Sequence, residues 1–410
     1  MILFESKEKC CACGACLNKC PRDAIQMEED EYGFLYPRIN TQKCIECGAC
    51  VKVCDLKKKK KERQSQLGSG CYFAVCKNSN TLMKSTSGGL FSIIAQRFIE
   101  NNGAVYGCSL QKMDNNYFEI KHIKVDKKEE LKFILGSKYV QSRADVVFND
   151  IKESLQKNKK ILFCGTPCQV AGLKNYLGKS YENLYTIDLV CHGTPNVKIF
   201  NDFIKMLEKK YKKQIVNVNF RKKFKKISSN IFFYFEILFS NGRTKRKFCK
   251  LLSYYGLFLD GDIYRESCYK CQYANANREG DITLGDGWGI EKRTPQLLVE
   301  NGGEIDTFYG SNSVMVNSFK GQDLFEMILS DIIFGKVDFS DISEYNHQLC
   351  YPSDKKEYYE KIMQMYKEEG YEALDRFYFK EIGKKNIIRY GVYYPLSRKI
   401  PSSLKKILKR

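Results

Sequence analysis

The chain has 410 residues, of which 68 are Lys or Arg and 48 are Asp or Glu, so its formal net charge is +20. This length exceeds the ~150 residues of a typical domain and predicts two or three domains. The basic surplus favours an acidic partner, with a Lys-rich solvated surface as the plain alternative. No nucleic-acid-binding motif is found, so we expect no nucleic-acid partner, and no apolar run approaches the ~20 residues that span a bilayer.

The 19 cysteines recur at gaps of two and three residues, and no cleavable apolar leader precedes the first run. Cysteines at these gaps are typical of metal sites, whereas secreted disulfide frameworks follow a signal peptide. We therefore expect a soluble protein in a reducing, cytoplasmic compartment.

The N-terminal segment contains two cysteine runs with the same C-x2-C-x2-C-x3-C spacing. In bacterial ferredoxins three thiolates of such a run bind one 4Fe-4S cluster, and the fourth binds the other cluster. The spacing therefore predicts a first cluster and a second cluster, held by Cys10, Cys13, Cys16 and Cys54 and by Cys44, Cys47, Cys50 and Cys20, respectively. Zinc sites are the alternative, but they do not account for a repeated fourth cysteine.

Two details of these runs depart from the simple repeat. Pro21 follows the fourth cysteine of the first run, whereas Asp55 takes that place after the second run. We expect Asp55 to loosen this turn slightly without removing a ligand. Cys11 fits no ligand position, and we interpret it as a spare thiol.

A ferredoxin domain of α+β type is therefore predicted at residues 1–63, followed by a Lys-rich and Ser/Gly-rich linker up to residue 70. In residues 64–335 short apolar strands alternate with amphipathic helices, which is typical of α/β architecture. Examples are helices at 87–101 and 145–156 and strands at 104–110 and 160–163.

Residues 336–410 are charged and Tyr-rich, and they predict a helical C-terminal extension. Its end, residues 397–410, alternates apolar and basic residues and is a candidate membrane-surface helix. We expect membrane contact there to be weak at most, because few large apolar residues are present.

Four more cysteines are placed to meet at one site. The strand 161–163 leads into Thr166 and Pro167, which suit a helix start and put Cys168 in the first helical turn, where the helix end favours a thiolate. The next strand, 184–190, ends at Cys191, and consecutive parallel strands bring both thiols to one edge of the sheet. A hairpin-like C-x2-C pair supplies Cys268 and Cys271.

Four thiolates are the number that a cubane needs, so this set predicts a third 4Fe-4S cluster next to the ferredoxin domain. Cys164 is the rival ligand, but we expect it to be buried in the strand end and to point elsewhere. The alternative is that all these cysteines are ordinary buried residues.

Several motifs in this part of the chain occur together in one known family. They are SGGL at 87–90, GSKY at 136–139, GTPCQ at 165–169, CHG at 191–193, the pair Cys268 and Cys271, and GDITLGD at 280–286. With them the sequence resembles the coenzyme F-420 hydrogenase/dehydrogenase beta-subunit family, over roughly residues 71–290. The resemblance implies an α/β domain that binds FAD and a 4Fe-4S cluster, with ligands at the four cysteines named above.

The resemblance also points to residues that would contact the flavin. Ser87, Gly88 and Gly89 open an amphipathic helix, and bare N–H groups at such a start suit a pyrophosphate, although a plain N-cap is the alternative. Lys138, beside Tyr139, is a candidate contact to a phosphate or to the flavin ring, with an ordinary solvated lysine as the alternative.

The expected function is an FAD-dependent oxidoreductase that couples a hydride donor or acceptor to the clusters. The small molecule is open, and the deazaflavin coenzyme F-420 is one option. His192 is the only histidine near a motif and is a weak candidate for proton transfer. The alternative is a non-catalytic, ferredoxin-like carrier subunit that docks on a partner enzyme.

Overall fold

The computed structural model describes residues 3–57, 70–225 and 233–393. Most of the predicted linker and the basic end at 397–410 lie outside these described residues. Within the described ranges, no helix combines the length and the apolar composition that crossing a bilayer requires.

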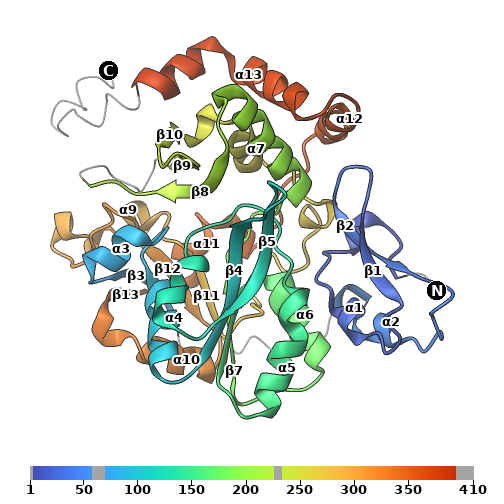
Figure 1. Cartoon of the computed structure of the whole chain (residues 1–410). Coiled ribbons are helices and arrows are strands. Elements are labelled where there is room, and N and C mark those ends of the chain that lie inside the picture. The colour runs from blue at the N-terminus through green and yellow to red at the C-terminus, as the bar shows by residue number, and fades with distance from the viewer. Residues whose placement is uncertain (1–2, 58–69, 226–232, 394–410) are drawn as a thin grey trace.

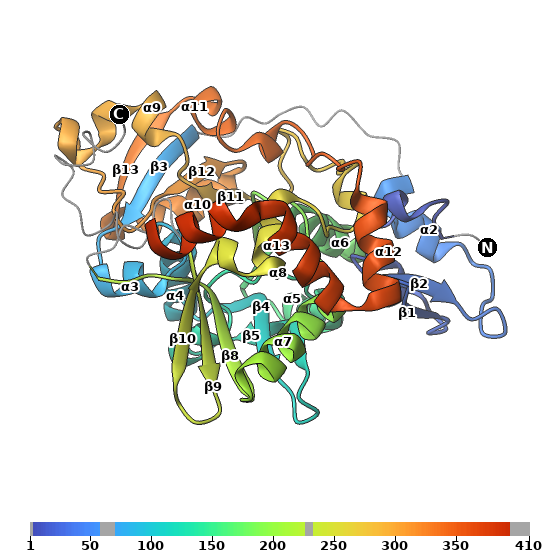
Figure 2. The same cartoon turned by 90° about the horizontal axis from the view of Figure 1, so that it is seen from above.

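The ferredoxin segment is a small unit at one end of the molecule (Figures 1 and 2). It contains helices α1 (Ala15–Lys19) and α2 (Ala49–Val53) and an antiparallel hairpin of β1 (Ile25–Glu29) and β2 (Leu35–Ile39). The two helices carry the third cysteine of each run, so the sequence repeat reappears as a structural repeat.

The larger part of the chain surrounds an eight-stranded mixed sheet. In sheet order its strands are β13 (Ile332–Val337), β3 (Gly70–Cys76), β12 (Asn312–Val316), β11 (Ile282–Asp286), β7 (Leu184–Leu189), β6 (Ile161–Gly165), β4 (Ala104–Lys112) and β5 (Phe118–Val125). Strands β4, β6, β7 and β11 pair in parallel. The pairings outside these four strands, β4 with β5, β11 with β12, β12 with β3 and β3 with β13, are antiparallel.

The α/β prediction therefore holds for the centre of the sheet but not for its edges. Strand β5 follows β4 through a connection of five residues, 113–117, which is too short for the crossover that a parallel pair needs. At the other edge, β3, β12 and β13 come from distant parts of the chain.

Helices cover both faces of the sheet. Helices α4 (Leu90–Glu100) and α10 (Phe319–Glu326) pack in one core, and α5 (Phe148–Gln156) and α6 (Pro167–Leu177) pack in another. Successive residues of β6 alternate between these cores, because side chains of a strand point to opposite faces. The short helices α3 (Ser79–Lys84), α9 (Ile290–Arg293) and α11 (Phe339–Ser343) lie near β3 and β12.

A further core, rich in aromatic residues, joins the remaining elements. It includes residues of the antiparallel sheet β8 (Ile215–Lys222), β9 (Tyr234–Phe239) and β10 (Thr244–Phe248), and of helices α7 (Val197–Tyr211), α8 (Ser253–Asp260), α12 (Tyr359–Glu369) and α13 (Tyr371–Ile388). Figure 2 shows α13 crossing over α8 and α12 lying beside the ferredoxin hairpin. The C-terminal helices thus pack on the larger sheet domain and next to the ferredoxin segment.

Candidate functional site

The cysteines predicted for the first cluster lie close together. Burial, with a contribution from the nearby thiols of Cys13 and Cys54, raises the pKa of Cys10 to about 11. Burial and the same neighbours also raise the pKa of Cys16. Thiols that disfavour one another's ionisation in this way become thiolates when a metal centre supplies the opposing charge.

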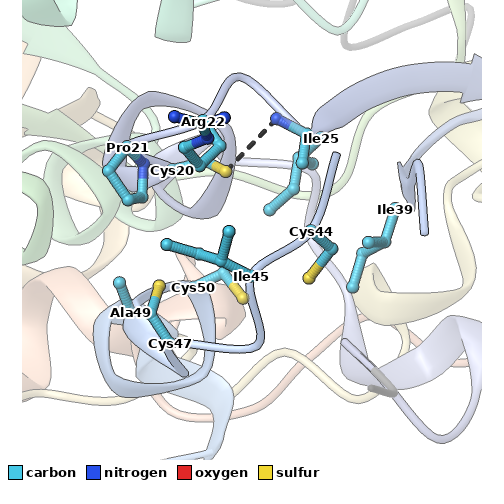
Figure 3. A pocket seen from close by; sticks show the side chains of 11 residues that line it. Cys20, Pro21, Arg22, Ile25, Ile39, Cys44, Ile45, Cys47, Ala49 and Cys50 are labelled. Carbon is cyan, nitrogen blue, oxygen red and sulfur yellow. Dashed lines mark hydrogen bonds between the residues drawn. The ribbon is translucent and has the colours of Figure 1, made fainter. Parts of the chain in front are cut away.

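The cysteines predicted for the second cluster line one small hollow in the ferredoxin segment (Figure 3). Cys20, Cys44, Cys47 and Cys50 all border this hollow, together with apolar side chains such as Ile39. The Ala24 N–H donates to the Cys20 sulfur at 3.3 Å, and the Glu46 N–H donates to the Cys44 sulfur at 3.4 Å. Backbone donors of this kind stabilise the sulfurs of iron-sulfur sites.

Gly14 and Gly48 hold equivalent places in the two runs, but their surroundings differ. Both have positive φ, 74° and 71°, and precede α1 and α2, as the tight turn around a cluster requires. A Cβ at Gly14 would lie 2.1 Å from the Cβ of Asp145, whereas a Cβ at Gly48 would meet nothing within 4 Å. The first-run turn is therefore covered by the larger domain, and the second-run turn is open.

Asp55, which stands where a proline is expected, forms hydrogen bonds with the larger domain. Its carboxylate accepts hydrogen bonds from the Asn175 side chain, the Gln272 side chain and the Tyr273 hydroxyl, each at 3.0 Å. Gln272 and Tyr273 directly follow Cys271. Asp55 thus ties the end of the second run to the larger domain, a role that sequence reasoning missed.

The structure brings the four cysteines of the predicted third cluster together from three segments. Cys168 lies in the first turn of α6, Cys191 follows β7, and Cys268 ends a 3-10 turn that leads to Cys271. Burial and the thiols of the other three raise the pKa of Cys191. The C-x2-C pair was predicted as hairpin-like, but it follows a helical turn instead, because the Cys268 N–H donates to the Arg265 carbonyl three residues earlier.

The start of α6 is built as its sequence predicts. The Thr166 N–H donates to the Gln169 side chain at 3.0 Å, and the Thr166 hydroxyl lies 3.2 Å from the Cys168 sulfur. A hydrogen bond from Cys11 lowers the pKa of Cys168 to about 7. The Thr166 hydroxyl also lowers this pKa, whereas burial raises it. Cys11 also hydrogen-bonds with Cys13, and both bonds raise its own pKa. The thiol interpreted as spare therefore lies between the first-cluster and third-cluster cysteines.

Cys164, the rival ligand, is buried near the end of β6. Burial raises its pKa to about 12, with Asp188 and Cys108 adding to the shift and Lys138 opposing it. In the described part of the chain no group of three or more His, Cys, Asp or Glu residues is arranged around a single metal ion. A cubane binds each thiolate through a separate iron, so this finding concerns single ions only.

One cavity of about 430 Å³ borders both the predicted flavin contacts and the third cysteine set. Its wall includes Ser87, Gly89, Lys138, Tyr139, His192, Trp288 and three of the cysteines, Cys168, Cys191 and Cys268. This volume lies within the ~300–1,000 Å³ range of cofactor pockets.

Two predicted contacts are explained by packing. A Cβ at Gly88 would lie 2.6 Å from the Asn312 N atom, so Gly88 lets the backbone approach β12 and is not part of the wall. The Ser87 hydroxyl donates to the Ser311 carbonyl at 2.5 Å, and the Leu90 N–H donates to the Asn312 side chain at 3.3 Å. Close packing against β12, and not an N-cap, therefore accounts for part of this motif.

Cationic side chains surround this cavity. Burial lowers the pKa of Lys138 to about 8, and its ammonium donates to the Leu135 carbonyl at 2.8 Å. Lys223 lies behind the wall, where it donates to the Ser87 carbonyl at 2.5 Å and where burial lowers its pKa to about 7. These charges suit an anionic ligand such as a pyrophosphate.

Arg221 also lines the cavity. It donates to Asp286 at 2.7 Å and stacks on the Phe233 ring at 3.9 Å, but its buried Nε atom has no hydrogen-bond partner among the described residues. A buried donor without a partner is rare and suits a missing ligand. Sequence reasoning did not single out Arg221, because the basic run at 221–226 looks like a solvated surface.

His192 is exposed to the cavity. Desolvation by the surrounding protein lowers its pKa, and Asp286 opposes that shift. This shift favours the neutral form of the imidazole.

Comparisons with known proteins match two separate segments of the chain. Residues 9–57 match the family described as 4Fe-4S dicluster domain, which supports two iron-sulfur clusters. Residues 158–343 match the family described as the C terminus of the coenzyme F420 hydrogenase/dehydrogenase beta subunit. No curated protein matches the chain.

Among solved structures, a chain of the F420-reducing NiFe hydrogenase complex from Methanosarcina barkeri is similar, with 13% identity over 75% of this chain and 90% of that chain. The TM-score of this pair is 0.42. The protein is thus an iron-sulfur electron-transfer protein in which a segment that matches a 4Fe-4S dicluster domain precedes a region that matches the C terminus of the coenzyme F420 hydrogenase/dehydrogenase beta subunit.

Proposed function

We propose that this chain is an FAD-dependent oxidoreductase that moves electrons between a small-molecule hydride donor or acceptor and its iron-sulfur clusters. The observation that carries the proposal is the shared cavity, whose wall contains predicted flavin contacts as well as three cysteines of the third set. When bound, FAD exchanges a hydride with small molecules and single electrons with clusters.

The residues at the cavity fit FAD in charge and in shape. The start of α4 at Gly89 and the cations Lys138, Lys223 and Arg221 favour the anionic pyrophosphate. Tyr139 offers an aromatic face at the wall. The unpaired Nε of Arg221 is satisfied once a ligand oxygen reaches it.

A third 4Fe-4S cluster held by Cys168, Cys191, Cys268 and Cys271 would adjoin this cavity. These cysteines come from segments that also contact the ferredoxin segment. A Cβ at Gly172, one turn beyond Cys168, would lie 2.7 Å from the Cβ of Cys13. The proposed order of carriers is therefore the cavity, the third cluster, the first cluster and the second cluster.

We place three domains along this path. The ferredoxin domain covers residues 1–63, the flavin and cluster domain covers 64–335, and the extension covers 336–410.

His192 is the candidate proton carrier for the small molecule, which is the deazaflavin coenzyme or another hydride carrier. A redox partner protein is then expected to meet the second cluster, whose side of the segment is open at Gly48.

A flavin-binding titration tests this proposal. Full-length protein purified without oxygen is reconstituted with FAD, and bound flavin is measured by fluorescence and visible absorption. We expect about one FAD per chain, bleaching of the flavin bands by reduced coenzyme F-420 or another hydride donor, and weaker binding by Arg221→Met. Arg246→Met, which removes an exposed arginine paired with Glu236, is the matched control.

The alternative of a non-catalytic carrier subunit gives a different result. A chain that contains clusters but binds no FAD under these conditions contradicts the proposal and favours the carrier. Equal FAD affinity in the Arg221→Met and Arg246→Met variants contradicts the assignment of the cavity.

A further inference from the structure

Arg265 is an arginine buried without an ionic partner. Its side chain lies in the interior with only 1% of the residue exposed, and within the described ranges it forms no ion pair with a carboxylate. A buried guanidinium without a counter-ion is strongly unfavourable, because desolvation of the charge is not offset. Negative charge from another source would offset this cost.

The hydrogen bonds of Arg265 join the two domains. Its Nε donates to the Gln141 side chain at 2.9 Å, and its two terminal nitrogens donate to the carbonyls of Cys10 at 3.3 Å and Leu35 at 2.7 Å. The guanidinium also lies over the ring of Tyr36, 4.5 Å from its centroid. All these partners are neutral, so they position the charge without balancing it.

Arg265 lies beside cysteines of two predicted sites. Its guanidinium donates to the carbonyl of Cys10, a first-cluster cysteine, at 3.3 Å. Its own carbonyl accepts from the Cys268 N–H at 2.9 Å, and Arg265, Cys168 and Cys268 line the same cavity. The hollow lined by the second-cluster cysteines does not include Arg265.

We infer that Arg265 is the shared countercharge of the first and third clusters, and that it raises the reduction potentials of both. This inference rests on the proposed function for the third cluster only. An oxidised 4Fe-4S cluster with four thiolates carries a charge of about −2, and reduction adds one more negative charge. A fixed cation beside the cluster stabilises the reduced form more than the oxidised form, which raises the potential.

Redox titration followed by EPR tests the inference on full-length, anaerobically purified protein. In Arg265→Gln we expect two of the three cluster potentials to fall, each by at least a tenfold change in the reduction equilibrium, which is about 59 mV for one electron. The second cluster is expected to keep its potential. Arg246→Gln, which removes an equal charge from an exposed arginine of β10 paired with Glu236, is expected to leave all three unchanged.

Arg265→Lys separates charge from shape, because lysine keeps the charge but lacks the planar guanidinium fork that directs these three hydrogen bonds. Potentials near the wild-type values in Arg265→Lys, with lowered values in Arg265→Gln, support the countercharge. Three results would overturn it. The potentials could shift equally in Arg265→Lys and Arg265→Gln, all three clusters could shift equally, or the potentials in Arg265→Gln could match those in Arg246→Gln.

The iron content of the wild-type protein keeps this test separate from the proposed function. A chain with only two clusters refutes the third site, yet one of its two potentials must still fall in Arg265→Gln. If Arg265→Gln loses iron, Arg265→Lys is compared with Arg246→Gln instead. Lysine keeps the positive charge, so first-cluster or third-cluster potentials that are lower in Arg265→Lys than in Arg246→Gln contradict the inference.

Discussion

Removal of the Asp55 carboxylate is expected to loosen the ferredoxin segment from the larger domain without removing a cluster ligand. Three donors lose their acceptor in Asp55→Ala, but Asn175 keeps a second bond, to the Ala171 carbonyl at 2.8 Å. Three hydrogen bonds are therefore lost, and of the three donors Asn175 still has an acceptor. Bonds to a charged acceptor contribute roughly 1.5–3 kcal/mol each.

Partial exposure of Asp55 reduces this contribution, so we expect Asp55→Ala to lower the stability of the docked segment by about 2–3 kcal/mol. Asp55→Asn keeps one acceptor oxygen and is expected to cost about 1 kcal/mol. Hydrogen exchange of the backbone amides in residues 3–57, measured by mass spectrometry, reports this loss directly. Asp114→Ala, at an exposed loop position, is the matched control.

The expected result is faster exchange in the ferredoxin segment of Asp55→Ala, with unchanged exchange in the central sheet and an unchanged iron count. Exchange in residues 3–57 that is as slow as in Asp114→Ala would refute the reasoning, because the three hydrogen bonds would then contribute nothing to docking.

Three further predictions concern the cysteines, the domain contact and the cavity. Cys54→Ser is expected to lose a cluster and Cys11→Ser to keep both ferredoxin clusters, as counted from iron and sulfide; equal losses would refute the ligand assignment. Gly172→Leu is expected to destabilise the chain by ~1–3 kcal/mol in urea unfolding, because its side chain has no room beside the first run, and an unchanged midpoint would contradict that contact. FAD affinity is expected to fall as pH rises from 6 to 9, because burial lowers the pKa of Lys223 to about 7 and of Lys138 to about 8, so both cations lose their protons in this window. Fluorescence titrations at several pH values check this, and a flat profile would exclude both lysines as phosphate partners.

Local patterns predicted the parts of the structure that depend on neighbours in sequence. The strand ending before Thr166 and Pro167 and the helix that begins there were confirmed, because a capping residue and a proline act within one turn. The repeated cysteine spacing likewise predicted two clusters, and the dicluster match supports both.

Contacts between distant residues could not be predicted in this way. Asp55 and Gln272 are 217 positions apart, and Arg265 reaches a carbonyl 255 positions away. Nothing in the local sequence distinguishes these side chains from solvated ones. The antiparallel edges of the sheet were missed for the same reason, since strand alternation alone does not say which distant strands pair.

The most direct test of the central claim is the iron and flavin content of anaerobically purified wild-type protein and of Cys268→Ala, with Cys164→Ala as the control. Three clusters predict about twelve irons and one flavin per wild-type chain, and a fall of about four irons in Cys268→Ala alone. A wild-type chain with about eight irons, unchanged in Cys268→Ala, would contradict the account by leaving no cluster between the cavity and the ferredoxin domain.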